Sequence, residues 1–123
     1  MPNVSAIMQR YAIAVSEETS IANAAKLMKA NKVSLMPVLK DERLVGIVRE
    51  EDLDSWNGDK KETINRIMEK PIFVLPTDEI DHVSEIMLKM HITRVPVVNN
   101  EKELIFLGIV TSSDVANAIK TGI

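Results

Sequence analysis

The sequence predicts a mixed α/β fold made of two copies of one β-α-β-β-α unit, each about sixty residues long. The first observation behind this prediction is that the same order of short motifs occurs in both halves of the chain. The second is composition: 46% of the residues are apolar but only 3% are aromatic, so aliphatic residues and methionine must form the core. The third is size, because 123 residues suffice for one domain or two closely packed halves. We therefore expect two pseudo-symmetric repeats, residues 1–60 and 61–123, that pack through their sheets and leave a cleft between them.

The first half contains apolar runs at strand spacing and one run at helical spacing. Ser20 precedes the helical run and suits the N-cap position. Pro37 lies inside a strand pattern, where it cannot donate to a sheet ladder, so we expect it at an edge, a bulge or a ligand cleft. The expected elements are a helical turn at 5–8 capped by Ser5, a strand at 11–15, a helix from residue 21, strands at 33–39 and 44–48 around a charged turn, and an acidic helix from residue 49 that ends at 57–58.

The second half repeats this order after a polar linker at residues 58–61. Its expected elements are a helical turn at 63–68, a strand at 72–75, a helix over 80–90 capped by Asp78, a strand at 93–98, a longer hairpin at 99–104, and a final strand and helix. The matching motifs are Ile7-Met8 with Ile67-Met68, Met36-Pro37-Val38 with Val95-Pro96-Val97, and Gly46-Ile47-Val48 and Asp52 with Gly108-Ile109-Val110 and Asp114.

The segment 108–114 carries the polar groups that best suit a ligand. It predicts the end of a buried strand followed by a helix, with Thr111 and Ser112 as candidate N-caps. A helix N-terminus offers unpaired N–H groups and partial positive charge to an anion. Thr111 and Ser113 could donate to phosphate oxygens, and Asp114 could accept from two sugar hydroxyls. Taken alone, the segment favours the simpler interpretation that these residues only cap a helix.

Charge and composition exclude several classes of function. The net charge of −3, the pI near 5.4 and the few aromatic rings argue against nucleic acid as a partner. The absence of cysteine excludes disulfides and thiolate metal sites. Residues 1–14 contain Arg10 and no long apolar run, so we expect neither a signal peptide nor a membrane span, and the cytoplasm is the default location.

In this order, and twice over, the motifs resemble a tandem pair of cystathionine-β-synthase (CBS) domains, a Bateman module, along nearly the whole chain. The resemblance implies that the chain binds an adenosine derivative, such as AMP, ADP, ATP or S-adenosylmethionine, between its repeats, and that it pairs as a disc-like homodimer. It implies that Asp114 holds the ribose, that Thr111 and Ser113 hold phosphate, and that Ile109 lines the base. Whether Mg²⁺ accompanies ATP stays open.

The resemblance also implies that residues outside the segment 108–114 contact the ligand. In the other repeat, the implied contributors are Ile13, Val33 and Ser34, whose backbone groups would contact the adenine edge. Arg94 occupies a position where family members often carry a basic residue directed at phosphate, a role that its bidentate hydrogen bonds suit. The alternative for Arg94 is an ordinary surface salt bridge.

The corresponding site of the first repeat departs from this pattern. Asp52 is retained, but Arg49 and Glu51 stand where the second repeat has hydroxyl residues. Glu51 would repel a phosphate, whereas Arg49 would attract one. We therefore expect two unequal sites, with the tighter one at Asp114 and a weaker one formed by Arg49, Asp52 and Thr93.

Two other chemistries have less support. A nucleophilic triad could be drawn from Ser112 or Ser113, His82 or His91, and Asp114, but such a site needs a strained nucleophile turn and no serine is flanked by glycines. A metal site could be drawn from three residues of one helix start, Asp78, Asp81 and His82, although helix N-termini favour carboxylates in any case. The methionines at core-facing positions are interpreted as packing rather than as a copper site: Met8, Met28, Met36, Met68, Met87 and Met90.

The leading hypothesis is therefore a stand-alone nucleotide-sensing module without enzymatic activity. The second hypothesis is a ligand-free module that dimerises or docks on a protein, and the substituted first site supports it. Trp56 could anchor a dimer contact or cover the core. The apolar faces of the helices at 53–56 and 115–119 are the expected dimer surfaces.

Overall fold

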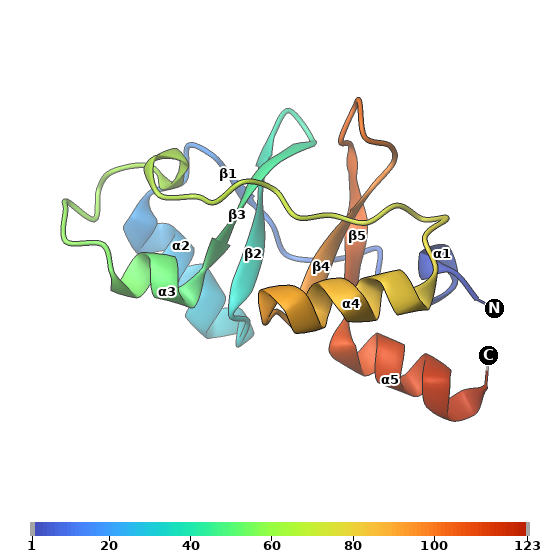
Figure 1. Cartoon of the computed structure of the whole chain (residues 1–123). Coiled ribbons are helices and arrows are strands. Elements are labelled where there is room, and N and C mark those ends of the chain that lie inside the picture. Colours follow the sequence, from blue (N-terminus) through green and yellow to red (C-terminus); the bar gives the residue numbers. More distant parts are fainter. Residues whose placement is uncertain (1, 123) are drawn as a thin grey trace. The chain divides into compact units, whose positions relative to one another are not determined.

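The computed structural model describes residues 2–122, and the predicted mixed α/β fold is confirmed (Figure 1). The chain divides into two compact units, Met1–Ala12 with Ile72–Ile123, and Ile13–Pro71. We name them the Asp114 unit and the Asp52 unit after the aspartates that follow their last strands. Among the described residues, no helix is both long enough and apolar enough to span a membrane.

The leading segment of each half packs with the unit that the other half builds. Residues 2–12 carry helix α1 (Val4–Ile7) and belong to the Asp114 unit, whereas residues 61–71 carry the 3-10 helix η1 (Ile64–Arg66) and belong to the Asp52 unit. Backbone hydrogen bonds fix both segments: Gln9 exchanges two with Ile109 at 2.7 and 2.8 Å, and Glu69 exchanges two with Ile47 at 2.8 and 3.1 Å. This exchange brings residues far apart in sequence beside each aspartate.

Besides η1, the Asp52 unit contains a three-stranded sheet and two α-helices. Its elements are β1 (Val15–Ser16), α2 (Ile21–Asn31), β2 (Leu35–Lys40), β3 (Arg43–Arg49) and α3 (Glu50–Asp54). Strand β2 is central, parallel to β1 and antiparallel to β3. Ser20 caps α2 as predicted, because its Oγ accepts from the Asn23 N–H at 3.1 Å. The core is aliphatic with two methionines, and its fully or nearly fully buried members include Ile21, Met28, Met36, Val38, Val48 and Ile64.

The Asp114 unit contains a two-stranded sheet with α4 and α5 packed together against it (Figure 1). Besides α1, its elements are α4 (Ile80–Met90), β4 (Arg94–Val98), β5 (Phe106–Thr111) and α5 (Ser112–Thr121). Helix α4 buries Ile80, Val83 and Met87 on one face, as its spacing predicts. Strands β4 and β5 pair so that Arg94 lies opposite Thr111 and Pro96 opposite Ile109.

Two predicted strands are much shorter than expected. Residues 11–14 form no strand, and of residues 72–75 only Val74 makes a bridge, to Val97. Proline explains both corrections. Val74 donates to the Pro96 carbonyl at 3.0 Å and accepts from Val98 at 3.1 Å, but Pro96 has no N–H with which to continue the parallel ladder toward residue 72. Pro37 limits β1 in the same way beside its parallel partner.

Three predicted helix ends are also wrong. Helix α1 begins after Asn3 rather than Ser5, and the Ser5 hydroxyl donates to Asn3 at 2.6 Å. Helix α4 has Glu79 as its N-cap, because the Asp78 carboxylate accepts instead from the Leu75 N–H at 2.8 Å. Helix α3 ends at Asp54, before the predicted stop at 57–58. The hydroxyl of Ser5 and the carboxylate of Asp78 bond to other partners instead of capping these helices, and α3 is only five residues long.

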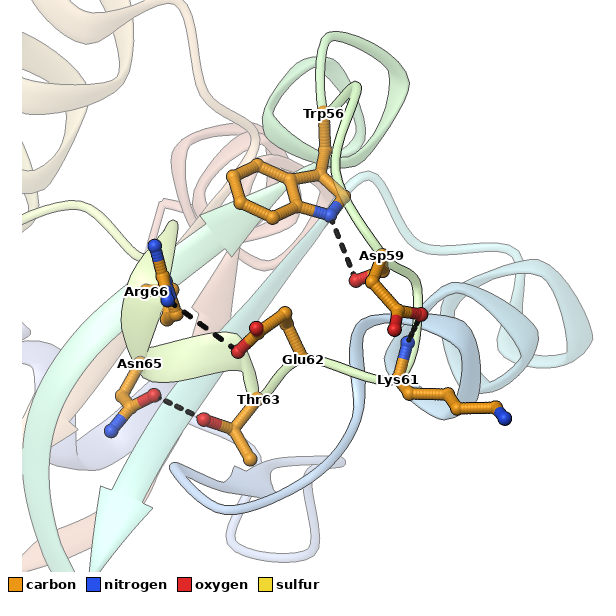
Figure 2. Close-up of polar contacts among 7 residues, drawn as sticks. All are labelled: Trp56, Asp59, Lys61, Glu62, Thr63, Asn65 and Arg66. Atoms are coloured by element: carbon orange, nitrogen blue, oxygen red, sulfur yellow. Dashed lines mark hydrogen bonds and ion pairs between the residues drawn. The ribbon is translucent and has the colours of Figure 1, made fainter.

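Trp56 covers the core of the Asp52 unit. It is half-buried against the core cluster, and its indole N–H donates to the Asp59 carbonyl at 3.1 Å (Figure 2). Arg66 lies over the ring at 6.0 Å from its centroid and pairs with Glu62 at 3.6 Å. These contacts support the core-covering interpretation of Trp56.

Candidate functional site

The junction of β5 and α5 places Asp114 in a capping box. Thr111 is the N-cap, as predicted, and its hydroxyl oxygen accepts from the Asp114 N–H at 3.2 Å. In return, Asp114 Oδ2 accepts from the Thr111 N–H at 2.9 Å and from its hydroxyl at 2.8 Å. The Thr111 hydroxyl proton is therefore used within the protein, whereas Asp114 Oδ1 takes no part in the cap.

Gln9 reaches this carboxylate from the leading segment. Its side-chain amide lies 3.1 Å from Oδ2 and 3.3 Å from Oδ1 of Asp114. A glycine permits the approach, because a Cβ on Gly108 would lie 2.2 Å from the Gln9 carbonyl oxygen, far inside van der Waals contact. The missing side chain of Gly108 thus allows the backbone of residues 8–10 to pass close to β5.

Arg94 brings a cation to the same junction from the neighbouring strand. It lies opposite Thr111, its Nε is buried without a hydrogen-bond partner, and it forms no ion pair with any of residues 2–122. Burial lowers the pKa of the guanidinium, while the Asp114 carboxylate opposes that shift. Among the described residues, Arg94 therefore has no partner for the ordinary surface salt bridge that was its alternative role.

The remaining predicted residues of the Asp114 unit differ in exposure. The Ser113 side chain is exposed in the first turn of α5, whereas Ile109 is fully buried. Two shallow surface hollows adjoin the carboxylate, of about 480 and 260 Å³. The first is lined by Ser113, Asp114, Ala116, Asn117 and Lys120, and the second by Ala6, Ile7, Asp114, Asn117, Ala118 and Thr121.

The other predicted contributors belong to the Asp52 unit and stay predictions. Ile13 and Val33 are half-buried and pack against the core of that unit. Ser34 is exposed, and its carbonyl accepts from the Glu50 N–H at 3.0 Å. In the Asp114 unit, the carbonyl of the exposed Thr93 accepts from the Ser112 N–H at 2.8 Å, so both carbonyls cap the first turn of a helix.

The β3–α3 junction repeats the geometry with different charges. Asp52 Oδ2 accepts from the Arg49 N–H at 2.8 Å, as Asp114 does from Thr111. Glu69 takes the place of Gln9: its carboxylate lies 3.0 Å from Arg49 Nε and near the carboxylate of Asp52. Burial, the hydrogen bond to Asp52 and the negative charges of Asp52 and Glu51 raise the pKa of Glu69, while Arg49 opposes the shift.

Sequence reasoning missed Gln9 and Glu69. Each follows one of the matched Ile-Met pairs, at residues 7–8 and 67–68, so the repeat alignment contains a signal. Their role could not be read from it, because each pair contacts the unit built by the other half. The two Ile-Met motifs thus position a polar side chain against an aspartate.

The alternative chemistries gain nothing from the geometry. Within residues 2–122, no group of three or more histidines and carboxylates could hold a metal ion. His82 is half exposed and its Nε2 lies 4.0 Å from Asp78. Asp114 bonds to Thr111 and Gln9 rather than to a histidine. Met28, Met36 and Met87 are buried, which agrees with a packing role.

Among the curated proteins similar to this chain are enzymes that are much longer than it. The chain is 32% identical over 115 residues to the L-aspartate semialdehyde sulfurtransferase of Methanocaldococcus jannaschii, which covers 92% of this chain and 22% of that protein. It is 34% identical over 115 residues to the homoserine O-acetyltransferase of Methanosarcina acetivorans, which covers 92% of this chain and 21% of that protein. The chain thus spans about a fifth of the length of these curated relatives.

Solved structures match nearly the whole chain. The CBS domain pair of protein MJ0100, in complex with 5′-methylthioadenosine and S-adenosyl-L-methionine, is 29% identical with a TM-score of 0.79 over 98% of both chains. The CBS domains of a transcriptional regulator from Streptococcus pneumoniae are 26% identical with a TM-score of 0.79, over 94% of this chain and 97% of that one. The CBS domain family model matches residues 4–56 and 64–121. The chain therefore belongs to the CBS domain family and carries two CBS domains in tandem.

Proposed function

We propose that the chain is a regulatory module that binds an adenine nucleotide at the Asp114 unit and has no enzymatic activity of its own. The ligand class is supported by the MJ0100 domain pair, which binds two adenosine compounds and resembles this chain over nearly its full length. Asp114 would accept the ribose hydroxyls, and the phosphate would lie toward Arg94, the Ser113 hydroxyl and the N-terminus of α5.

Arg94 is the observation that carries this proposal. A guanidinium whose Nε is buried without a hydrogen-bond partner loses solvation that the described residues do not replace. An anionic ligand would supply the missing acceptor through charge-assisted hydrogen bonds. The carboxylate of Asp114, which suits a sugar, is close enough to Arg94 to oppose the lowering of its pKa, so the ribose and the phosphate of a nucleotide would each have a partner in one unit.

Isothermal titration with AMP, ATP, S-adenosylmethionine and adenosine tests the proposal. We expect at least one of these compounds to bind, and Asp114→Ala to lose most of the heat. Glu85→Ala, at an exposed position of α4, is the control that should bind as the wild type does. A melting scan gives a second readout, because a ligand at a hundredfold its dissociation constant adds about 2.7 kcal/mol to folding stability. Absence of binding by all four compounds would refute the proposal.

Dimerisation or docking is the second candidate, supported by the helical face of the Asp114 unit. Leu88 on α4 and Ile119 on α5 are 77% and 66% exposed. Large apolar side chains in water favour a contact with another protein surface. Sedimentation of the wild type and of the double variant Leu88→Glu, Ile119→Glu tests this: a homodimer through this face becomes a monomer, whereas an unchanged mass rules this face out.

A further inference from the structure

Each unit places one arginine in the same cross-strand pair, but on opposite strands. In the Asp114 unit, Arg94 on β4 lies opposite Thr111 on β5. In the Asp52 unit, the buried Leu35 on β2 lies opposite Arg49 on β3. Arg49 is thus the last residue of β3 and directly precedes α3, whose first turn carries Asp52. Arg94 is the first residue of β4 and lies across from Thr111, the residue that directly precedes α5 and its Asp114. The two junctions have the same fold and the same formal cation.

The two junctions differ in the side chain that the leading segment places beside the aspartate, which is Gln9 in one unit and Glu69 in the other. Gln9 contributes a neutral amide, which donates to Asp114 and leaves Arg94 without an ion pair among residues 2–122. Glu69 contributes a carboxylate, which pairs with Arg49 at 3.0 Å and lies near the negative charge of Asp52. The cation of the Asp52 junction is thus paired within the protein, and an added phosphate would meet the carboxylates of Asp52, Glu69 and Glu51.

We propose that Gln9 and Glu69 are the specificity-determining residues of the two aspartate sites, Gln9 admitting a phosphorylated adenosine ligand at Asp114 and Glu69 excluding one at Asp52. This inference rests on the proposed function and assigns its selectivity to a single side-chain difference. The backbone of both residues is held alike, because Gly108 and Gly46 let the Gln9 and Glu69 carbonyls approach the strand. The selectivity therefore comes from amide against carboxylate and not from a different loop path.

Reciprocal exchange of the two side chains tests the inference on the full chain. We expect Gln9→Glu to weaken AMP binding at least tenfold more than it weakens adenosine binding, because the new carboxylate repels phosphate and pairs with Arg94. Gln9→Met, which removes the amide without adding charge, should change the AMP-to-adenosine ratio less than threefold. We expect Glu69→Gln to raise the AMP stoichiometry from one to two per chain in isothermal titration.

The outcomes separate the inference from the proposed function. Failure of the wild type to bind any of AMP, ATP, S-adenosylmethionine and adenosine overturns both. Binding of one of these compounds without binding of AMP or ATP overturns the inference alone. Binding by the wild type with an unchanged AMP-to-adenosine ratio in Gln9→Glu overturns the inference alone, and so does a stoichiometry that stays at one in Glu69→Gln. Melting curves verify that each variant folds. If Gln9→Glu does not fold, the test rests on Glu69→Gln, which relieves the repulsion between Glu69 and Asp52.

Discussion

The side-chain nitrogen of Gln9 donates to both carboxylate oxygens of Asp114, 105 positions further along the chain. The contact exists because the leading segment runs over β5 and is held there by two backbone hydrogen bonds between Gln9 and Ile109. The carboxylate is thereby oriented from two sides, by Gln9 and by the Thr111 cap. An acceptor held in this way is preorganised and would lose less freedom if a ligand bound to it.

Gly108→Ala should detach the leading segment from β5. The new Cβ would lie 2.2 Å from the Gln9 carbonyl oxygen, which is backbone and cannot rotate away. Loss of the two hydrogen bonds to Ile109 should lower the free energy of unfolding by about 2 kcal/mol, measured in urea. Faster hydrogen exchange at the amides of Gln9 and Ile109 would locate the change.

Gly46→Ala is the matched variant in the Asp52 unit. There the Cβ would lie 2.7 Å from the flexible Met68 Sδ and 2.8 Å from the Glu69 carbonyl, so the clash is milder. We expect a smaller loss of stability than for Gly108→Ala. Equal losses in both variants would show that the close approach of Gln9 to β5 is not the cause.

Thr111→Val should destabilise the start of α5. Valine keeps the shape but removes the hydroxyl that accepts from the Asp114 N–H and donates to its carboxylate. The expected loss is about 1 kcal/mol in the free energy of unfolding, as for other N-cap residues. Ser112→Ala, at an exposed first-turn position, should change stability by less than about 0.5 kcal/mol. If the two variants lose the same amount, the cap does not stabilise the unit as described.

Local features of the fold were predictable from the sequence, and contacts between distant segments were not. Ser20, Thr111 and the apolar face of α4 were identified correctly, because capping and helical periodicity depend on near neighbours. The short strands were missed because the limit set by Pro96 acts on a partner strand, not on its own. Gln9 was missed because its partner lies in the other half of the sequence.

Arg94→Met should separate binding from stability. Removing a partly buried cation whose Nε has no hydrogen-bond partner should leave the free energy of unfolding unchanged or raise it. The same change should weaken AMP at least tenfold, which corresponds to about 1.4 kcal/mol, and leave adenosine within threefold. Lower stability together with unchanged AMP affinity would mean that Arg94 serves the fold and not the ligand.

Glu69 should make the stability of the Asp52 unit depend on pH. Burial and the neighbouring Asp52 raise the pKa of Glu69 above its ordinary value of 4.5, so the folded state binds a proton more tightly than the unfolded state. The stabilisation is fully present below pH 4.5 and is lost as the pH rises through the folded pKa of Glu69. Urea unfolding followed by the fluorescence of Trp56, which packs on the core of this unit, measures it from about pH 4 to 8. Glu69→Gln should flatten the profile over this range, whereas Glu18→Gln, at an exposed position of the same unit, should leave it as in the wild type. A Glu69→Gln profile as steep as that of the wild type would assign the pH dependence to other groups.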